Sequence, residues 1–142
     1  MILDEARIFS CDWSVAGGSL AYDLSHLEAD WSRVVQAYEV RSITHEGQFV
    51  YNSEFLLFKT SSDIPANFSG YPTVAKRRLW QVIFAIKQRF LDEVRPDVVE
   101  HFIKAPYGAA ARLALYQRYL NLSDYDVALT PQTFTFIRRD LR

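Results

Sequence analysis

A glutamate and a histidine stand next to each other in an apolar segment, Val98 to Lys104, that we expect to form a central strand. Successive side chains of a strand point to opposite faces of a sheet, so Glu100 and His101 would face different sides. Either side chain is a candidate general base, and an imidazole titrates near neutral pH. The chain offers no second ligand at the spacing of a metal site, so we expect no bound metal.

Three consecutive cations, Lys76-Arg77-Arg78, stand at the start of the longest apolar repeat with helical spacing. Cations at that end of a helix oppose the macrodipole, whose N-terminal end is positive. A bound anion such as a phosphate would relieve the conflict, because free N–H groups at a helix N-terminus also bind anions. A turn exposed to solvent is the alternative interpretation.

The composition predicts one globular domain over residues 1–142, with 49% hydrophobic and 23% charged residues. Aromatic residues make up 15%, a share that suits a core, a ligand cleft or an interface. The formal net charge of -1 argues against a nucleic-acid partner. The alternative is a local basic patch, for which the candidates are Lys76-Arg77-Arg78 and the C-terminal Arg138, Arg139 and Arg142.

The beginning of the chain has acidic residues where a signal peptide has basic ones, and no apolar run approaches the ~20 residues that cross a bilayer. We therefore expect a cytoplasmic protein with no membrane partner. Cys11 is the single cysteine, and we expect it to be buried in a strand. Sequence signatures of serine hydrolases, P-loop nucleotide hydrolases and zinc proteases are absent.

The first part of the chain predicts strands and one helix. Gly17-Gly18 interrupts any regular structure there, and Ser25 with Glu28 fits a capping box at a helix N-terminus. Apolar residues follow at helical spacing, namely Leu27, Trp31, Val34, Val35 and Tyr38. The strands predicted in this part lie at Arg7–Asp12, Tyr38–Thr44 and Gln48–Thr60.

Residues Thr73 to Arg139 predict a helix, a strand, a second helix and a hairpin. Thr73 is the expected N-cap of the first helix, and Arg95-Pro96 is its expected end. The apolar stripes of the two helices are Leu79, Val82, Ile83, Ile86 and Phe90, and Ala109, Leu113, Tyr116 and Leu120. The full order, β-α-β-β-(β)-α-β-α-β-β, predicts an α/β (α+β) domain with a mixed, mostly antiparallel sheet flanked by helices.

The segment Ala111 to Leu120 is similar to a helix of the GNAT superfamily of N-acyltransferases, in which a Leu-Tyr pair precedes a basic residue. The pair here is Leu115-Tyr116, followed by Arg118. A wider set of runs resembles small phage and prophage proteins with a GNAT-like end; these runs are Arg77–Ile83, Arg95–Val99, Leu115–Arg118 and Phe134–Arg138.

The resemblance implies an acyl-CoA-dependent N-acyltransferase, with acetyl-CoA as cofactor and an amine-bearing substrate. It implies that a splayed strand pair receives the pantetheine arm and that Tyr116 protonates the departing thiolate. Tyr116 lies on the apolar stripe of its helix, so the alternative interpretation is a buried structural tyrosine. Glu54 lies on the strand where such enzymes often place a base, and His101 is the alternative base. The turn and helix N-terminus that receive the pyrophosphate carry over to Gly70, Thr73, Val74, Ala75, Lys76 and Arg77.

The pyrophosphate turn of the family reads Gln/Arg-x-x-Gly-x-Gly/Ala, whereas this chain has Asn67 to Pro72. Tyr71 and Pro72 follow Gly70, and a proline supplies no N–H donor. Ala109 stands where an asparagine often precedes the tyrosine. These departures favour a second hypothesis, a catalytically inactive GNAT-like phage-type protein that binds a host or phage macromolecule in the host cytoplasm. The aromatic content also suits a homodimer.

Overall fold

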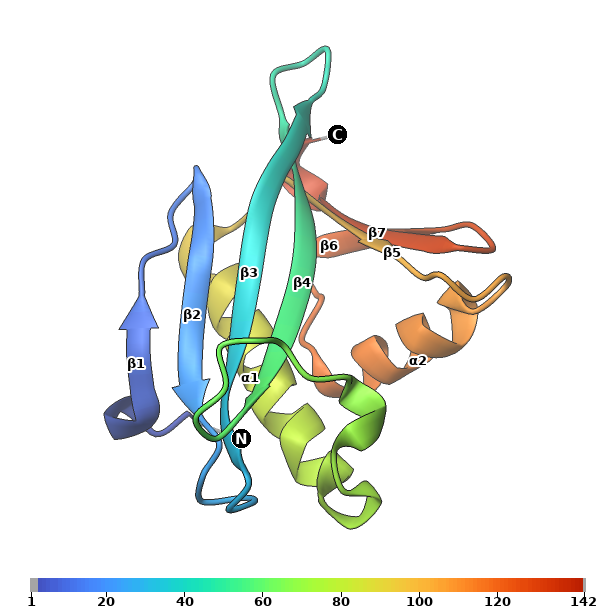
Figure 1. Ribbon diagram of the computed structural model, residues 1–142. Coiled ribbons are helices and arrows are strands. Elements are labelled where there is room, and N and C mark those ends of the chain that lie inside the picture. Colours follow the sequence, from blue (N-terminus) through green and yellow to red (C-terminus); the bar gives the residue numbers. More distant parts are fainter. Residues whose placement is uncertain (1–2, 142) are drawn as a thin grey trace.

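The computed structural model describes residues 3–141 and contains one seven-stranded sheet with two helices (Figure 1). The strands are β1 (Ile8–Cys11), β2 (Gly17–Asp23), β3 (Trp31–Ile43), β4 (Phe49–Lys59), β5 (Val98–Phe102), β6 (Tyr125–Leu129) and β7 (Thr133–Arg138). The helices are α1 (Lys76–Val94) and α2 (Ala109–Tyr119). Short 3-10 turns lie at Glu5–Arg7, Phe68–Gly70, Thr73–Ala75 and Arg139–Leu141.

The strand order across the sheet is β1-β2-β3-β4-β5-β7-β6. All neighbouring strands are antiparallel except β4 and β5, which are parallel because α1 connects them. Both helices pack on the same face of the sheet, and α1 crosses behind β3 and β4 in Figure 1. The mixed, mostly antiparallel sheet that the sequence predicts is therefore confirmed.

The helix predicted from the spacing of Leu27 to Tyr38 is wrong, because this segment forms a turn followed by β3. Ser25 and Glu28 belong to that turn, in which the main-chain N–H of Glu28 bonds the carbonyl of Leu24. Along β3 the buried residues are Trp31, Val34, Gln36 and Tyr38. From Val34 onward they alternate as a strand requires, and a bulge between Trp31 and Arg33 shifts the register before them.

The segment with Gly17-Gly18 is also part of the sheet, in contrast to the predicted break. Both glycines begin β2 and pair with Glu39 and Tyr38 of β3. Gly18 has a φ of +133°, and a Cβ there would lie 2.7 Å from the carbonyl oxygen of Asp12. Glycine is therefore required at this position, where two backbone segments approach closely.

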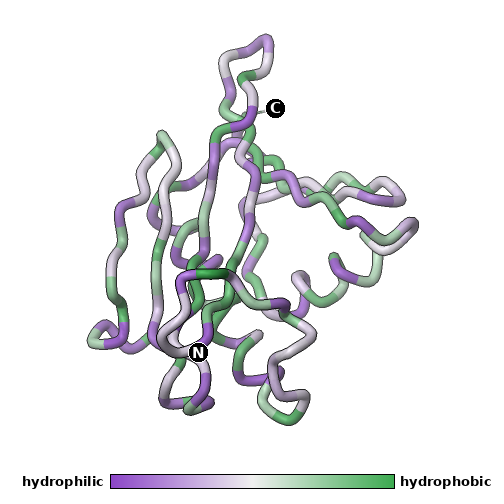
Figure 2. The backbone as a smooth tube through the Cα atoms, viewed as in Figure 1, coloured by the Kyte–Doolittle hydropathy of each residue, from purple (hydrophilic) through white to green (hydrophobic). Residues whose placement is uncertain are grey.

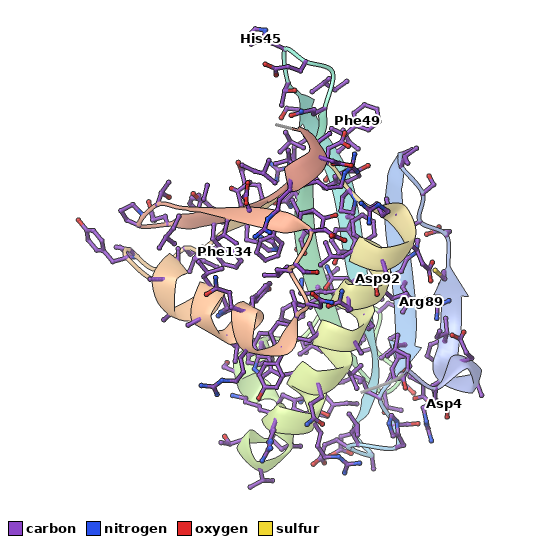
Figure 3. The ribbon with its side chains drawn as sticks, turned by 180° about the vertical axis from the view of Figure 1, so that it is seen from behind. Asp4, His45, Phe49, Arg89, Asp92 and Phe134 are labelled. Carbon is purple, nitrogen blue, oxygen red and sulfur yellow. The ribbon has the colours of Figure 1, made fainter. Side chains whose placement is uncertain are left out.

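Helix α1 joins the two halves of the core. Its Leu79, Val82, Ile83 and Ile86 pack with β2, β3 and β4. Its Phe84, Phe90 and Leu91 belong to a second cluster, which contains residues of β3, β4, β5, β7 and α2 and in which Phe90 stacks on Tyr38 of β3. Hydrophilic residues cover much of the projecting tip of the β3–β4 hairpin, shown purple in Figure 2. His45 lies at this tip, far from the helices (Figure 3).

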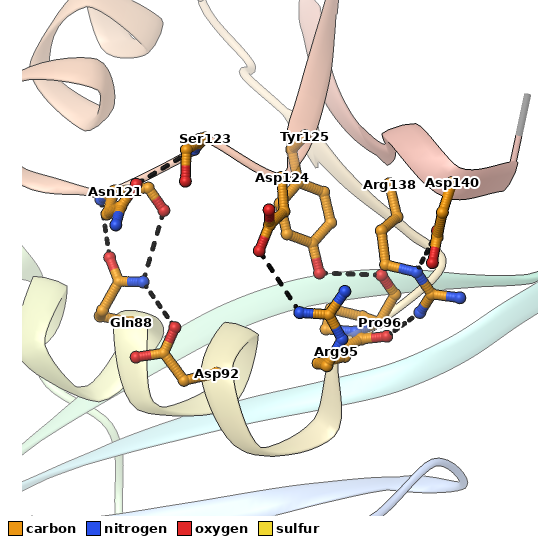
Figure 4. Close-up of polar contacts among 10 residues, drawn as sticks. All are labelled: Gln88, Asp92, Arg95, Pro96, Asn121, Ser123, Asp124, Tyr125, Arg138 and Asp140. Atoms are coloured by element: carbon orange, nitrogen blue, oxygen red, sulfur yellow. Dashed lines mark hydrogen bonds and ion pairs between the residues drawn. The ribbon is translucent and has the colours of Figure 1, made fainter.

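Residues at the C-terminal end of α1 make hydrogen bonds and ion pairs with the segment between α2 and β6 and with the end of β7 (Figure 4). Arg95 adopts the left-handed conformation, with φ at +51°, and ends the helix before Pro96, as predicted. The main-chain N–H of Asn121 donates to Gln88 at 2.7 Å, and the Tyr125 hydroxyl donates to the Pro96 carbonyl at 3.0 Å. These bonds connect the segment before β6, and β6 itself, to the C-terminal end of α1.

Candidate active site

The sheet opens between β4 and β5. Their parallel ladder runs only from Val50 opposite Val98 to Asn52 opposite Glu100, whereas β4 continues to Lys59. Beyond the ladder the two strands lean apart, β4 downward and β5 to the right in Figure 1. A cavity of about 210 Å³ lies in this split, and its lining residues are Ser53, Glu54, Phe55, Lys87, His101, Phe102, Ile103, Arg112 and Tyr116.

The cavity reaches both faces of the sheet. Side chains on a strand alternate, and the contacts of β4 show which residues face the helices. Ser53 bonds Lys87 of α1, so Glu54 points to the opposite, helix-free face. On β5, His101 contacts Tyr116 of α2, so Phe102 lies on the same side as Glu54. The split therefore connects a helix-covered side with an open side.

Lys87 is the lysine of α1 that points into this split, and it is 3% exposed. Its Nζ donates to Ser53 Oγ at 2.9 Å and lies 5.3 Å from the centre of the Tyr116 ring. Burial, with a smaller contribution from the positive charge of Arg112, lowers the pKa of Lys87 from 10.5 to about 7. No carboxylate lies within 4 Å of its amine among residues 3–141.

Lys87 was not among the residues singled out from the sequence. A signal was present, however: Trp80, Phe84, Lys87 and Leu91 follow one another at helical spacing on a second stripe beside the main apolar stripe. A lysine on such a stripe is buried when a second element packs against it. Here that element is α2, through Tyr116.

His101 lies on the helix-covered side, stacked on Phe134 with ring centres 4.4 Å apart. Phe134 itself lies between the β6–β7 hairpin and α2 (Figure 3). The Nδ1 of His101 is 3.2 Å from the Phe134 carbonyl, so it carries the proton and leaves Nε2 as the acceptor. Burial and the neighbouring Lys87 lower the pKa of His101 from 6.5 to about 3, and His101 is therefore neutral at physiological pH.

Tyr116 is 4% exposed and meets Phe84, His101 and Phe134 edge-on. Burial raises its pKa to about 12, although nearby Arg112 acts in the opposite direction. Tyr116 is consequently protonated near neutral pH and available as a hydrogen-bond donor or general acid. The structure thus brings together the three predicted catalytic residues, Tyr116, Glu54 and His101, around one cavity.

The predicted bases differ in their suitability. Glu54 is exposed at the mouth of the split and is accessible to a substrate from the open side. Glu100 is exposed and does not line the cavity, so it takes no part in this site. His101 is buried, with a pKa lowered to about 3, and is better suited to orienting and accepting hydrogen bonds than to removing protons.

The residues predicted to hold a pyrophosphate lie at the N-terminal end of α1, away from the cavity lining. Gly70, Thr73, Val74 and Arg77 are exposed, Lys76 is half-buried and Ala75 is buried. Thr73 belongs to a 3-10 turn and makes no side-chain cap, contrary to the prediction. A Cβ at Gly70 would meet no atom within 4 Å, so no close approach requires glycine there.

An aromatic group lies between this helix end and the cavity. Phe55, Phe68 and Trp80 contact one another with ring centres 5.2 to 5.9 Å apart. Lys76 Nζ lies 5.1 Å from the Phe68 ring centre, and the Arg112 guanidinium lies 5.4 Å from that of Trp80. All three rings are partly exposed, and they form a continuous surface from the start of α1 to the split.

The free edge of β4 adjoins this surface. The Ala66 N–H donates to the Leu57 carbonyl at 2.7 Å, so Leu57 turns its main-chain groups away from β3. Phe55, two residues earlier, turns its main-chain groups the same way. Phe55 lies between the end of the β5 ladder at Asn52 and the bridge at Leu57. An extended ligand beside Phe55 would therefore meet main-chain groups of a strand edge.

Other features of the described residues lie apart from this site. Larger hollows of about 360 Å³ lie at Gln81–Gln88 beside Tyr119 and at Tyr107 beside Leu129, and neither shares a lining residue with the β4–β5 split. The first contains Asp92 and Tyr119, and the second has no carboxylate in its lining. No cluster of three His, Cys, Asp or Glu residues suitable for a metal occurs within residues 3–141. Over the same residues, neither helix has the length and apolarity needed to traverse a bilayer.

One further expectation is corrected. Cys11 is exposed, because its strand β1 is the edge of the sheet. At the opposite edge, the segment before β6 folds back onto the end of α1, where Asp124 pairs with Arg95 at 3.3 Å. Asp126 of β6 pairs with Arg139 at 3.0 Å.

Comparison of the chain with protein-family models, with curated proteins and with solved structures found no match.

Proposed function

We propose that this protein is an acyl-CoA-dependent N-acyltransferase of GNAT-like architecture that acts on an amine substrate. One observation carries the proposal: the split between β4 and β5 opens to both faces of the sheet, with a protonated tyrosine on one side and a carboxylate on the other. Acyl transfer needs an acid beside the leaving group and a base beside the incoming amine. Tyr116 and Glu54 have this arrangement.

An acyl-CoA thioester would supply an activated acyl group. The main-chain edge at Phe55 would hold the extended arm of such a ligand, and the half-buried Lys76 with exposed Arg77 would meet its phosphates at the first turn of α1. The rings of Phe68 and Trp80 form an apolar wall between these two points. The residues present therefore fit a long, thin ligand with an anionic end.

The remaining roles follow from protonation states. Glu54 accepts a proton from the ammonium group of the substrate, directly or through a water molecule, and leaves a neutral amine as the nucleophile. Tyr116 donates its hydroxyl proton to the departing thiolate; its pKa of about 12 ensures that the proton is present beforehand. His101 is neutral, so its Nε2 is available to accept a hydrogen bond in the cavity.

Isothermal titration with acetyl-CoA and CoA tests the first requirement, and thiol release with a panel of small amines tests the second. We expect Tyr116→Phe to bind acetyl-CoA as the unmodified protein does and to transfer the acyl group at least about tenfold more slowly. We expect Glu54→Gln to shift the dependence of the rate toward higher pH, at which the substrate amine is already neutral. No binding of either ligand at millimolar concentration would rule out the proposal.

A second candidate function is the binding of a macromolecular partner without catalysis. It is favoured by exposed apolar side chains at the ends of β5 and the β6–β7 hairpin. Tyr107 and Leu129, which line one hollow, are 80% and 51% exposed, and Phe102 on the opposite face of the sheet is 61% exposed. Chemical cross-linking tests this candidate. A partner captured by the unmodified protein and lost with Tyr107→Ser, together with no acyl transfer, would favour binding over catalysis.

A further inference from the structure

Lys87 is a buried amine with more donors than partners. A protonated lysine has three N–H donors, and among residues 3–141 the Lys87 amine makes one hydrogen bond, to Ser53. Ser53 Oγ also receives the amide of Gln36 at 3.1 Å, so its acceptor capacity is largely used. Around the rest of the amine lie the rings of Tyr38 and Tyr116, with centres 6.0 and 5.3 Å away, and the cavity.

On the helix-covered side of the cavity, the residues that face Lys87 are cationic or neutral. Arg112 of α2 is cationic and forms no ion pair with a carboxylate among residues 3–141. His101 of β5 is neutral because of its low pKa, and Tyr116 of α2 and Tyr38 of β3 keep their protons because burial raises their pKa values. Glu54 of β4 points to the opposite, open side.

From this arrangement we propose that Lys87 and Arg112 form a receptor for a carboxylate group that enters the β4–β5 split. In terms of the acyltransferase function proposed above, on which this inference rests, the carboxylate is the distal one of a dicarboxylic acyl group such as succinyl. A planar guanidinium and an ammonium with free donors bind a carboxylate strongly once both are shielded from water. The transferred group is then a short dicarboxylic acyl chain and not acetyl.

The inference predicts a change in protonation on binding. At about pH 8 an amine with a pKa of about 7 is mostly neutral. A carboxylate beside Lys87 favours the ammonium form, so the complex takes up close to one proton. Tyr38 and Tyr116 keep their protons at this pH because burial raises their pKa values, and His101 stays neutral, so Lys87 is the group that titrates.

The test is isothermal titration of the full chain with succinyl-CoA, acetyl-CoA and free succinate at about pH 8, in buffers of low and high ionisation enthalpy. We expect succinyl-CoA to bind at least about tenfold more tightly than acetyl-CoA, with the uptake of about one proton. In Lys87→Met, the ratio of the affinities for succinyl-CoA and acetyl-CoA should fall to near one, and binding should no longer take up a proton. Lys104→Met, which removes an exposed lysine, is the matched control and should leave both unchanged.

Arg112→Met is a second variant, which tests the inference if Lys87→Met does not fold; it should weaken the preference for succinyl-CoA over acetyl-CoA. Equal binding of the two thioesters without proton uptake would overturn the inference while leaving the acyltransferase proposal in place. A preference that persists in both variants would also overturn it. Binding of free succinate with proton uptake, without binding of either thioester, would support the carboxylate site and refute the acyltransferase.

Discussion

Replacing Lys87 with methionine removes a buried amine and keeps a flexible apolar side chain of similar length. The difference between a pKa of 10.5 in the unfolded chain and about 7 in the native state corresponds to roughly 5 kcal/mol. The variant loses the hydrogen bond to Ser53, which for a charged donor is worth about 1.5–3 kcal/mol. We therefore expect Lys87→Met to raise the free energy of unfolding by ~2 kcal/mol or more at about pH 6.

The sign of the pH dependence follows from proton binding. Between the native pKa of about 7 and the ordinary value of 10.5, the unfolded chain binds a proton that the native protein has released. Stability of the unmodified protein therefore rises with pH across this window. Below about pH 7 both states carry the proton and the full cost of burying the charge is present. In Lys87→Met this contribution to the pH dependence disappears.

Urea unfolding followed by tryptophan fluorescence, at about pH 6, 7.5 and 9, measures both effects. The stability gain from Lys87→Met should shrink steadily as the pH rises. Lys104→Met, at an exposed position, should change the free energy of unfolding by less than about 0.5 kcal/mol at every pH. A destabilised Lys87→Met protein would refute the assignment of Lys87 as a buried amine without an ion-pair partner. A gain in the free energy of unfolding that does not vary with pH would also refute it.

Three further substitutions test the surroundings of the split. Burial lowers the pKa of His101 from 6.5 to about 3, so the unmodified protein should lose stability as the pH falls below 6.5, and His101→Gln should lose less, as measured by acid unfolding with circular dichroism. Phe134 is 0% exposed, and Phe134→Ala should cost about 3–5 kcal/mol in urea unfolding; a cost under about 1 kcal/mol would contradict its place in the core. Gly18→Ala should lower the melting temperature by several degrees, because its φ of +133° and the Asp12 carbonyl 2.7 Å from a Cβ leave no room; an unchanged melting temperature would contradict this packing.

The second half of the fold is predictable from its sequence because its signals are local. The apolar stripes of α1 and α2 repeat at helical spacing, and Arg95-Pro96 ends α1. The two strands of the hairpin flank a turn with Pro131. The periodicity of the helices and the residues that end α1 are local signals, so little depends on distant contacts; the start of α1 is the exception, because Thr73 does not cap it.

The first half misleads because a polar residue occupies a core position. Gln36 is fully buried in β3 between Val34 and Tyr38, where it donates to Ser53 and to the carbonyl of Glu54. If Gln36 is assumed to be exposed, the buried residues no longer alternate as in a strand, and the spacing of Val34, Val35 and Tyr38 is that of a helix. What permits the burial is hydrogen bonding to β4, which no local pattern reveals.

The candidate site also contains residues that were predicted from the sequence and one that was not. Tyr116, Glu54 and His101 were identified from residue types and resemblance, and the structure places all three around one cavity. Lys87 was missed because its burial depends on α2 packing against α1 across β5. The geometry of the split itself depends on where the β4–β5 ladder ends, which is a property of two strands separated in sequence by the whole of α1.

The most direct test of the central claim is to map the binding of CoA thioesters by amide chemical shifts on isotope-labelled protein. Two segments should shift together, Ser53–Phe55 of β4 and His101–Ile103 of β5, along with the first turn of α1. Residues at the tip of the β3–β4 hairpin, such as His45, should not change. Shifts confined to other surfaces, or no shifts at millimolar ligand, would contradict the assignment of the β4–β5 split as an acyl-transfer site.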